Sequence, residues 1–163
     1  MNRDRVTAAT SASPAQQLAA FIAKFDPAIG RLVRAARSAL RKRLPSAIEQ
    51  VYDNYNFLAI GYCTTERTSD CVVSLAVSAK GVSLSFYYGA GLADPDKILL
   101  GSGHQNRYIR LESAATLAEP AVDALIGAAI AQAKTPMPRT GRGRTLIKSV
   151  SAKQRPRRAV TAG

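Results

Sequence analysis

Apolar and polar residues alternate between residues 82 and 87, and this period of two constrains the fold more than any other feature of the chain. Successive side chains of a strand point to opposite faces of a sheet, so the segment predicts a strand with one buried face. Residues 57–63 and 71–77 also have the composition of strands, and only short stretches separate the three segments. Three consecutive, closely connected strands favour an antiparallel meander over strands that alternate with helices.

Three longer predicted helices begin with a start signal in which a polar residue precedes a proline. The pairs are Ser13-Pro14, Asp26-Pro27 and Glu119-Pro120. A proline at the first helical position costs nothing there, because that N–H has no partner within the helix. After Pro27, apolar residues recur at steps of three and four as far as Leu44, which predicts a helix with one buried side.

Two shorter helices and a fourth strand complete the predicted elements. Ser46 is a candidate cap for a helix that ends near Asp53, and Asp94-Pro95 opens a second that ends near Leu100. Residues 108–111 have strand character. We therefore expect an α+β fold, in which a small antiparallel sheet of about four strands packs against N-terminal helices and a C-terminal helix.

Charge divides the chain into a nearly neutral domain and a basic tail. Of the 23 basic residues, nine lie from Lys134 onward, where no acidic residue occurs; the first 133 residues carry 14 basic against 11 acidic residues. A segment rich in proline, glycine and charge of one sign buries too little apolar surface to fold, so the tail is predicted to be disordered. We expect a flexible leader over residues 1–13, one domain over 14–133 and a disordered tail over 134–163.

The helix after Pro27 carries a second basic cluster, opposite its apolar stripe. Such a helix face is ordinarily just solvated surface. Together with the tail, however, it predicts a site for nucleic acid or another polyanion, because cationic side chains bind phosphates in a salt-sensitive, sequence-independent way. No aromatic residues are interleaved with the basic ones in the tail, which favours contacts to the backbone over base readout. The predicted contact residues are Arg31, Arg34, Arg37, Arg41, Arg139, Arg142, Arg144, Lys148, Lys153, Arg155, Arg157 and Arg158.

A small-ligand cleft is the alternative interpretation. The six tyrosines lie near the ends of predicted strands, and a glycine-rich turn is followed by an arginine. Those glycines follow a predicted helix, where glycine is the usual C-terminal cap, whereas phosphate-binding loops precede a helix. The candidate lining residues are Tyr55, Tyr62, Gly101, Gly103 and Arg107.

No group of residues predicts catalysis, a metal or a cofactor. The acidic residues are scattered singly, and His104 is the only histidine. Cys63 and Cys71 flank a short polar stretch, so a hairpin would place them opposite each other, although two half-buried free thiols are the expected state in a reducing compartment. A signal peptide and an apolar run of about 20 residues are both missing. We expect a non-enzymatic cytoplasmic protein without a membrane partner.

Residues 89–111 read GAGLADPDKILLGSGHQNRYIRL and resemble the YdhG-like family, a family of unknown function. The stretch from Leu44-Pro45 to Tyr55, residues 80–86 and the Glu119-Pro120 pair support the resemblance, which covers about residues 27–133. It implies a compact α+β fold with an antiparallel sheet packed against helices. Some members resemble frataxin in fold and have been described as iron chaperones, so the resemblance also implies iron handling as an alternative. That role depends on exposed carboxylates, where this helix carries arginines.

Overall fold

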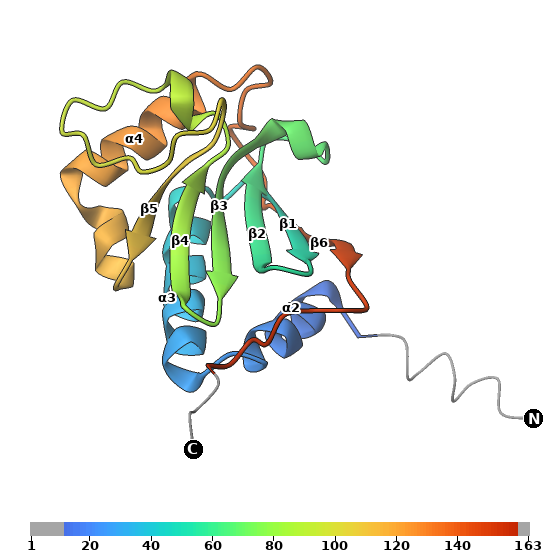
Figure 1. Ribbon diagram of the computed structural model, residues 1–163. Helices are drawn as coiled ribbons and strands as arrows, with labels where there is room; N and C mark the ends of the chain where they lie inside the picture. The colour runs from blue at the N-terminus through green and yellow to red at the C-terminus, as the bar shows by residue number, and fades with distance from the viewer. Residues whose placement is uncertain (1–11, 160–163) are drawn as a thin grey trace, which may run out of the picture.

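Six strands form one mixed sheet in the computed structural model, which describes residues 12–159 (Figure 1). The strand order is β5-β4-β3-β2-β1-β6. Neighbouring strands are antiparallel except at one edge, where β6 runs parallel to β1. The strands are β1 (Ile48–Asp53), β2 (Leu58–Cys63), β3 (Cys71–Ser78), β4 (Gly81–Phe86), β5 (Arg107–Leu111) and β6 (Thr145–Val150).

Three α-helices within the described range begin at the predicted prolines. They are α2 (Pro14–Ala23), α3 (Pro27–Arg43) and α4 (Pro120–Ala131), and the short 3-10 helices are η1 (Thr68–Asp70), η2 (Gly89–Gly91) and η3 (Ala114–Ala118). At α2 the Ser13 hydroxyl accepts the Gln16 N–H while the Gln16 side chain accepts the Ser13 N–H, so the helix starts with a capping box. Among residues 12–159, none of these helices is long and apolar enough to cross a bilayer.

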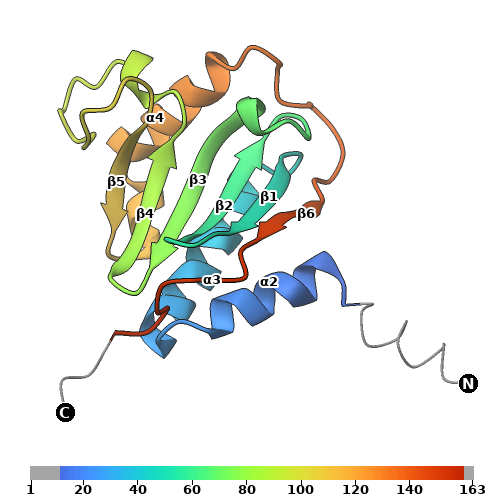
Figure 2. The ribbon, with the colours of Figure 1, turned by 45° about the vertical axis from the view of Figure 1, so that its right-hand side comes forward.

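The two faces of the sheet have different environments. Helices α3 and α4 pack on one face, and none of the described helices covers the other (Figures 1 and 2). On the covered face the strands contribute fully buried apolar side chains such as Val51, Leu75 and Leu84. The open face carries small residues in adjacent strands, such as Gly61 and Ser74, which are register partners. The core therefore lies between the sheet and the helices.

The prediction of an antiparallel sheet of about four strands is wrong, whereas the predicted α+β class is confirmed. One additional strand is β1, which occupies the segment from Ser46 to Asp53 that was expected to be a helix. Its side chains do alternate, but charged Glu49 and Asp53 stand at two of the inward positions and are buried there. Polar residues at inward positions hide the period of two, so the strand is specified by its pairing with β2 and not by its own pattern.

The other additional strand is β6, which lies in the tail that was predicted to be disordered. Residues 145–150 pair with β1, and the chain then crosses the end of the sheet beside α2 (Figure 2). The Ser151 N–H donates to the Asp53 carbonyl and the Arg155 N–H to the Tyr55 carbonyl. The tail has no acidic residues, but acidic residues of the domain form ion pairs with its arginines. Local composition cannot predict these pairs, because the partners are far apart in the sequence. Residues 1–11 and 160–163, in the predicted leader and at the end of the tail, lie outside the described range.

The segment from Asp94 to Leu100 forms a turn where a short helix was expected. Asp94 still acts as a cap, because its carboxylate accepts the N–H groups of Ile98 and Leu99 at 3.0 and 2.9 Å. Lys97 has a φ of 53°, which ends any helical turn at that point. Gly101, which we expected to cap that helix, has a φ of 106° and follows Leu100, the partner of Tyr108 in a single bridge.

Candidate functional site

Helix α3 presents a basic side to solvent along its whole length. Its apolar stripe packs into the core, and the side chains of Arg31, Arg34, Arg41 and Lys42 on the other side are exposed. Arg41 and Lys42 lie in the last helical turn, where a positive charge also balances the partial negative charge of the helix C-terminus. The helix alone would be a solvated basic surface.

The loop between α4 and β6 brings a further arginine to this surface. The Gly143 N–H donates to the Pro45 carbonyl at 2.8 Å, just beyond the end of α3. This contact depends on glycine, because a Cβ at Gly143 would stand 1.6 Å from the carbonyl oxygen of Ala47. The preceding Gly141 has a φ of 96°, which also favours glycine. Two glycines thus allow Arg142 between them to lie against the helix.

A basic groove of about 470 Å³ results where this loop meets α3. Its lining residues are Arg34, Arg37, Ser38, Arg41, Lys42, Pro45 and Arg142, and no acidic side chain of residues 12–159 is among them. Arg37 is neutralised by a bidentate pair with Glu49, at 2.9 Å for each hydrogen bond. The other four cations of the basic groove form no ion pair with a described carboxylate. The structure thus concentrates four uncompensated positive charges in one concavity.

Five of the predicted tail residues contact the domain itself. Arg144 forms an ion pair with Glu66, and the Lys148 ammonium donates to the Glu66 carbonyl. Arg155 stacks over the Tyr55 ring at 5.6 Å, and Arg158 donates to the Lys24 carbonyl at the end of α2. Arg157, the fifth, is buried. Arg31, Arg139 and Lys153 are exposed but do not line the basic groove.

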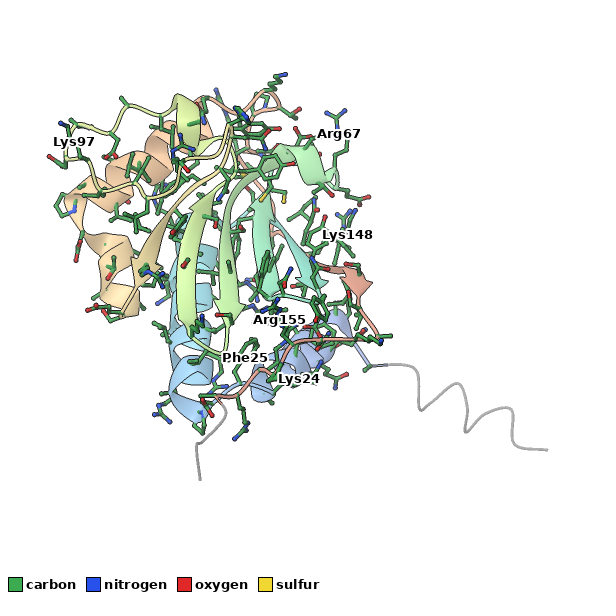
Figure 3. All side chains as sticks on the ribbon, in the orientation of Figure 1. Lys24, Phe25, Arg67, Lys97, Lys148 and Arg155 are labelled. Carbon is green, nitrogen blue, oxygen red and sulfur yellow. The ribbon has the colours of Figure 1, made fainter. Side chains whose placement is uncertain are left out.

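Arg157 is 6% exposed and reaches the fully buried carboxylate of Asp53, at 2.9 Å between Nη2 and Oδ1. Lys24 occupies the second oxygen of that carboxylate, at 2.8 Å. Figure 3 shows Lys24, Phe25 and Arg155 gathered where the tail passes α2. Burial would raise the pKa of Asp53, but hydrogen bonds from Lys24, Gln154 and Arg157 lower it below its ordinary value. A buried, paired guanidinium is not available to a polyanion, so Arg157 does not fit its predicted role.

The second buried carboxylate of β1 is also fully paired. Glu49 accepts hydrogen bonds from Arg37, from the Tyr62 hydroxyl at 2.8 Å and from the Thr145 hydroxyl at 2.7 Å. Burial opposes its ionisation, but these bonds, that of Arg37 first, lower the pKa of Glu49. Burial, with the neighbouring carboxylate, raises the pKa of Tyr62, so its hydroxyl remains a donor. These contacts hold α3 and β6 to β1.

The predicted small-ligand cleft is not assembled. Tyr62 is buried on the covered face, whereas Tyr55 lies in the β1–β2 turn with half of its surface exposed. Three strands separate β1 from β5, beside which the loop with Gly101 and Gly103 lies. Arg107 donates to the carbonyls of Gly103 and Asn106, so it closes its own loop.

A different concavity lies on the open face of the sheet. It measures about 280 Å³ and its lining residues are Gln50, Tyr52, Asn54, Ala59, Gly61, Cys63, Thr68, Cys71, Ser74 and Tyr87. We call it the open-face pocket. Small residues at neighbouring register positions form its floor, and the alternation of serine with apolar residues in β3 and β4 is the signal from which an open face could have been inferred.

Residues 12–159 hold no group of three histidine, cysteine or acidic side chains in ligand geometry. The chain matches no protein-family model, no curated protein and no solved structure. Its resemblance to the YdhG-like family, and the iron handling which that resemblance implies, stay predictions.

Proposed function

We propose that this protein is a non-enzymatic binding module for nucleic acid, held through the phosphate backbone in the basic groove between α3 and the α4–β6 loop. The observation that carries the proposal is the convergence of Arg34, Arg41, Lys42 and Arg142 around one concavity without a compensating acid of the described residues. Converging cations that lack an ion pair attract a polyanion, and each phosphate they contact releases counterions. We include a cytoplasmic location in the proposal.

Nucleic acid contacts are expected to be independent of sequence. The lining of the basic groove contains arginine, lysine, serine and proline but no aromatic side chain on which a base could stack. Arginine and serine are common donors to phosphate oxygens, and such contacts position a protein without reading bases. We therefore expect similar affinities for duplexes of unrelated sequence.

The test is a fluorescence anisotropy titration of labelled duplex DNA and duplex RNA over a salt series. Four cations that each neutralise one phosphate give a slope of log K against log salt of about −3.6 on DNA. The variant Arg34→Gln/Arg41→Gln/Arg142→Gln should reduce that slope to about −1. Point substitutions are required, because truncation after residue 133 would also delete β6 and the partners of Asp53 and Glu49.

The matched control is Lys80→Gln/Lys97→Gln/Arg110→Gln, which removes three exposed charges outside the basic groove. It lowers net charge by the same amount as the groove variant. The control should retain the slope of the unmodified protein. Equal losses in the two variants would mean that binding follows net charge alone, and the groove would then have no specific role.

A further inference from the structure

The two cysteines stand directly opposite each other at the end of the β2–β3 hairpin. Cys63 is the last residue of β2, Cys71 is the first of β3, and they are register partners at a β-bulge, where the register shifts between Tyr62 and Cys63. Just beyond them, the Thr64 N–H donates to the Asp70 carbonyl at 3.0 Å. Opposed residues in an antiparallel ladder have Cα atoms about 4.5–5.5 Å apart, and a disulfide spans about 4.4–6.8 Å. The strand pairing thus makes a disulfide between the two residues feasible.

The side chains also converge, because a glycine leaves room for both sulfur atoms. A Cβ added at Gly61 would lie 3.0 Å from the Cys71 Sγ and 3.6 Å from the Cys63 Sγ, so both thiols border the same small space. Hydrogen bonding with Cys71, followed by burial, raises the pKa of Cys63. The raised pKa means that the Cys63 sulfur is held as a thiol.

Polar contacts that do not involve the thiols hold the connecting loop. The Gln50 side chain donates to the carbonyls of Thr65 and Arg67, and the Thr65 hydroxyl bonds to the Asp70 carboxylate. The hairpin therefore holds the two thiols next to each other before any disulfide forms. Figure 2 shows this loop at the upper end of the sheet, where β2 passes into β3.

We propose that Cys63 and Cys71 are a modification site, at which a hydroperoxide converts the dithiol to an intramolecular disulfide. Cys71 is 8% exposed and lines both the open-face pocket and a second concavity beside α4, whereas Cys63 is 1% exposed. Cys71 is therefore the residue that meets the oxidant, and Cys63 is the resolving residue.

The oxidation of the two thiols proceeds in two stages. The Cys71 thiolate attacks one oxygen of hydrogen peroxide, the O–O bond breaks, and a sulfenic acid forms as hydroxide leaves and takes up a proton to give water. The Cys63 sulfur then attacks the sulfenic sulfur, and the S–S bond forms as the S–O bond breaks. The departing hydroxide takes the Cys63 proton as a second water. Two thiols are oxidised, and one peroxide is reduced.

The experiment treats the full chain with hydrogen peroxide, unfolds it in an alkylating reagent and measures the intact mass. The expected product has lost two hydrogen atoms, is not alkylated, and regains two alkylation sites after treatment with dithiothreitol. Since the chain has two cysteines, the assignment is unambiguous. A monomer that stays fully alkylatable, or that gains oxygen at both sulfur atoms without losing hydrogen, would overturn the proposal.

Two single variants test the assigned order. Cys63→Ser should accumulate a sulfenic acid at Cys71 that dimedone traps, because no resolving thiol remains. Cys71→Ser should react at least tenfold more slowly, since the remaining thiol is almost completely buried. Equal rates in the two variants would contradict the order, and a dimer linked through Cys71 in the unmodified chain would contradict intramolecular closure.

Discussion

Removing the charge of Asp53 should destabilise this protein far more than removing the charge of Arg157. The Asp53→Asn substitution leaves the Arg157 guanidinium buried with no carboxylate partner among residues 12–159. Its Nε and Nη1 atoms already lack a hydrogen-bond partner within the described part of the chain. Breaking a buried ion pair by neutralising one member costs about 3–5 kcal/mol, because the other charge remains desolvated. We expect Asp53→Asn to lower the free energy of unfolding by that amount.

Arg157→Met should cost less, about 1–2 kcal/mol, because Asp53 keeps Lys24 at 2.8 Å and the methionine can pack on the Phe25 ring. Lys24 is partly exposed, so its pair with Asp53 is screened and does not restore the full stability. The double variant should be more stable than Asp53→Asn alone, because it no longer contains an unpaired buried cation.

The assay is urea unfolding followed by circular dichroism, with the free energy taken from the midpoint and the slope. Arg155→Met is the matched control, because Arg155 is an exposed tail arginine without an acidic partner among the described residues, and it should change stability by about 0.5 kcal/mol or less. The reasoning is refuted if Arg157→Met is more destabilising than Asp53→Asn, or if the double variant is the least stable of the three.

Three further outcomes follow from other parts of the structure. The two buried carboxyl groups of β1, on Glu49 and Asp53, have a lowered pKa in the folded state. Their contribution to stability is therefore complete above the unfolded-state pKa of about 4 and is lost as the pH falls below that value. The urea midpoint should be level from about pH 8 to 5 and should decrease below about pH 4. Gly143→Ala should destabilise the fold by about 1–3 kcal/mol and weaken nucleic acid binding, as urea unfolding and anisotropy would show. Gly103→Ala is the control and should change neither, because a Cβ added there would meet no atom of residues 12–159 within 4 Å. Oxidation of Cys63 and Cys71 closes a loop of nine residues and should stabilise the protein by about 2–3 kcal/mol in urea unfolding, an increase that Cys63→Ser must abolish.

Local patterns in the sequence predict the three α-helices and the meander, although the same signal at Asp94-Pro95 opens a turn and not a helix. Proline after a polar residue marks the first residue of each α-helix, and the alternation from Val82 to Phe86 gives β4 its buried face. These signals work because capping, the 3.6-residue period and the two-residue period depend on neighbours in the sequence. The basic side of α3 follows from the same periodicity. Of the four groove cations without an ion pair, the predicted contact residues include Arg34, Arg41 and Arg142 and omit Lys42.

The remaining parts depend on contacts between distant residues. Glu49 and Asp53 look unsuited to an inward face until their partners Arg37, Thr145 and Arg157 are known. The tail resembles a disordered arm for the same reason, because the acids that hold it lie in another part of the chain. The basic groove needs the approach of the α4–β6 loop to α3, and only the GRG sequence around Arg142 hints at it.

The pairing of β6 with β1 has a consequence for the order of events during synthesis. Thr145 bonds to a carboxylate 96 residues earlier in the chain, so this edge of the sheet has a high contact order. Until residues 145–157 emerge from the ribosome, the edge of β1 remains an open template for a foreign strand, and its two carboxylates lack the partners that the tail supplies. A nascent chain that stalls before this point has a nearly complete sheet with one unprotected edge, the kind of surface at which strands of other chains can pair and aggregation begins.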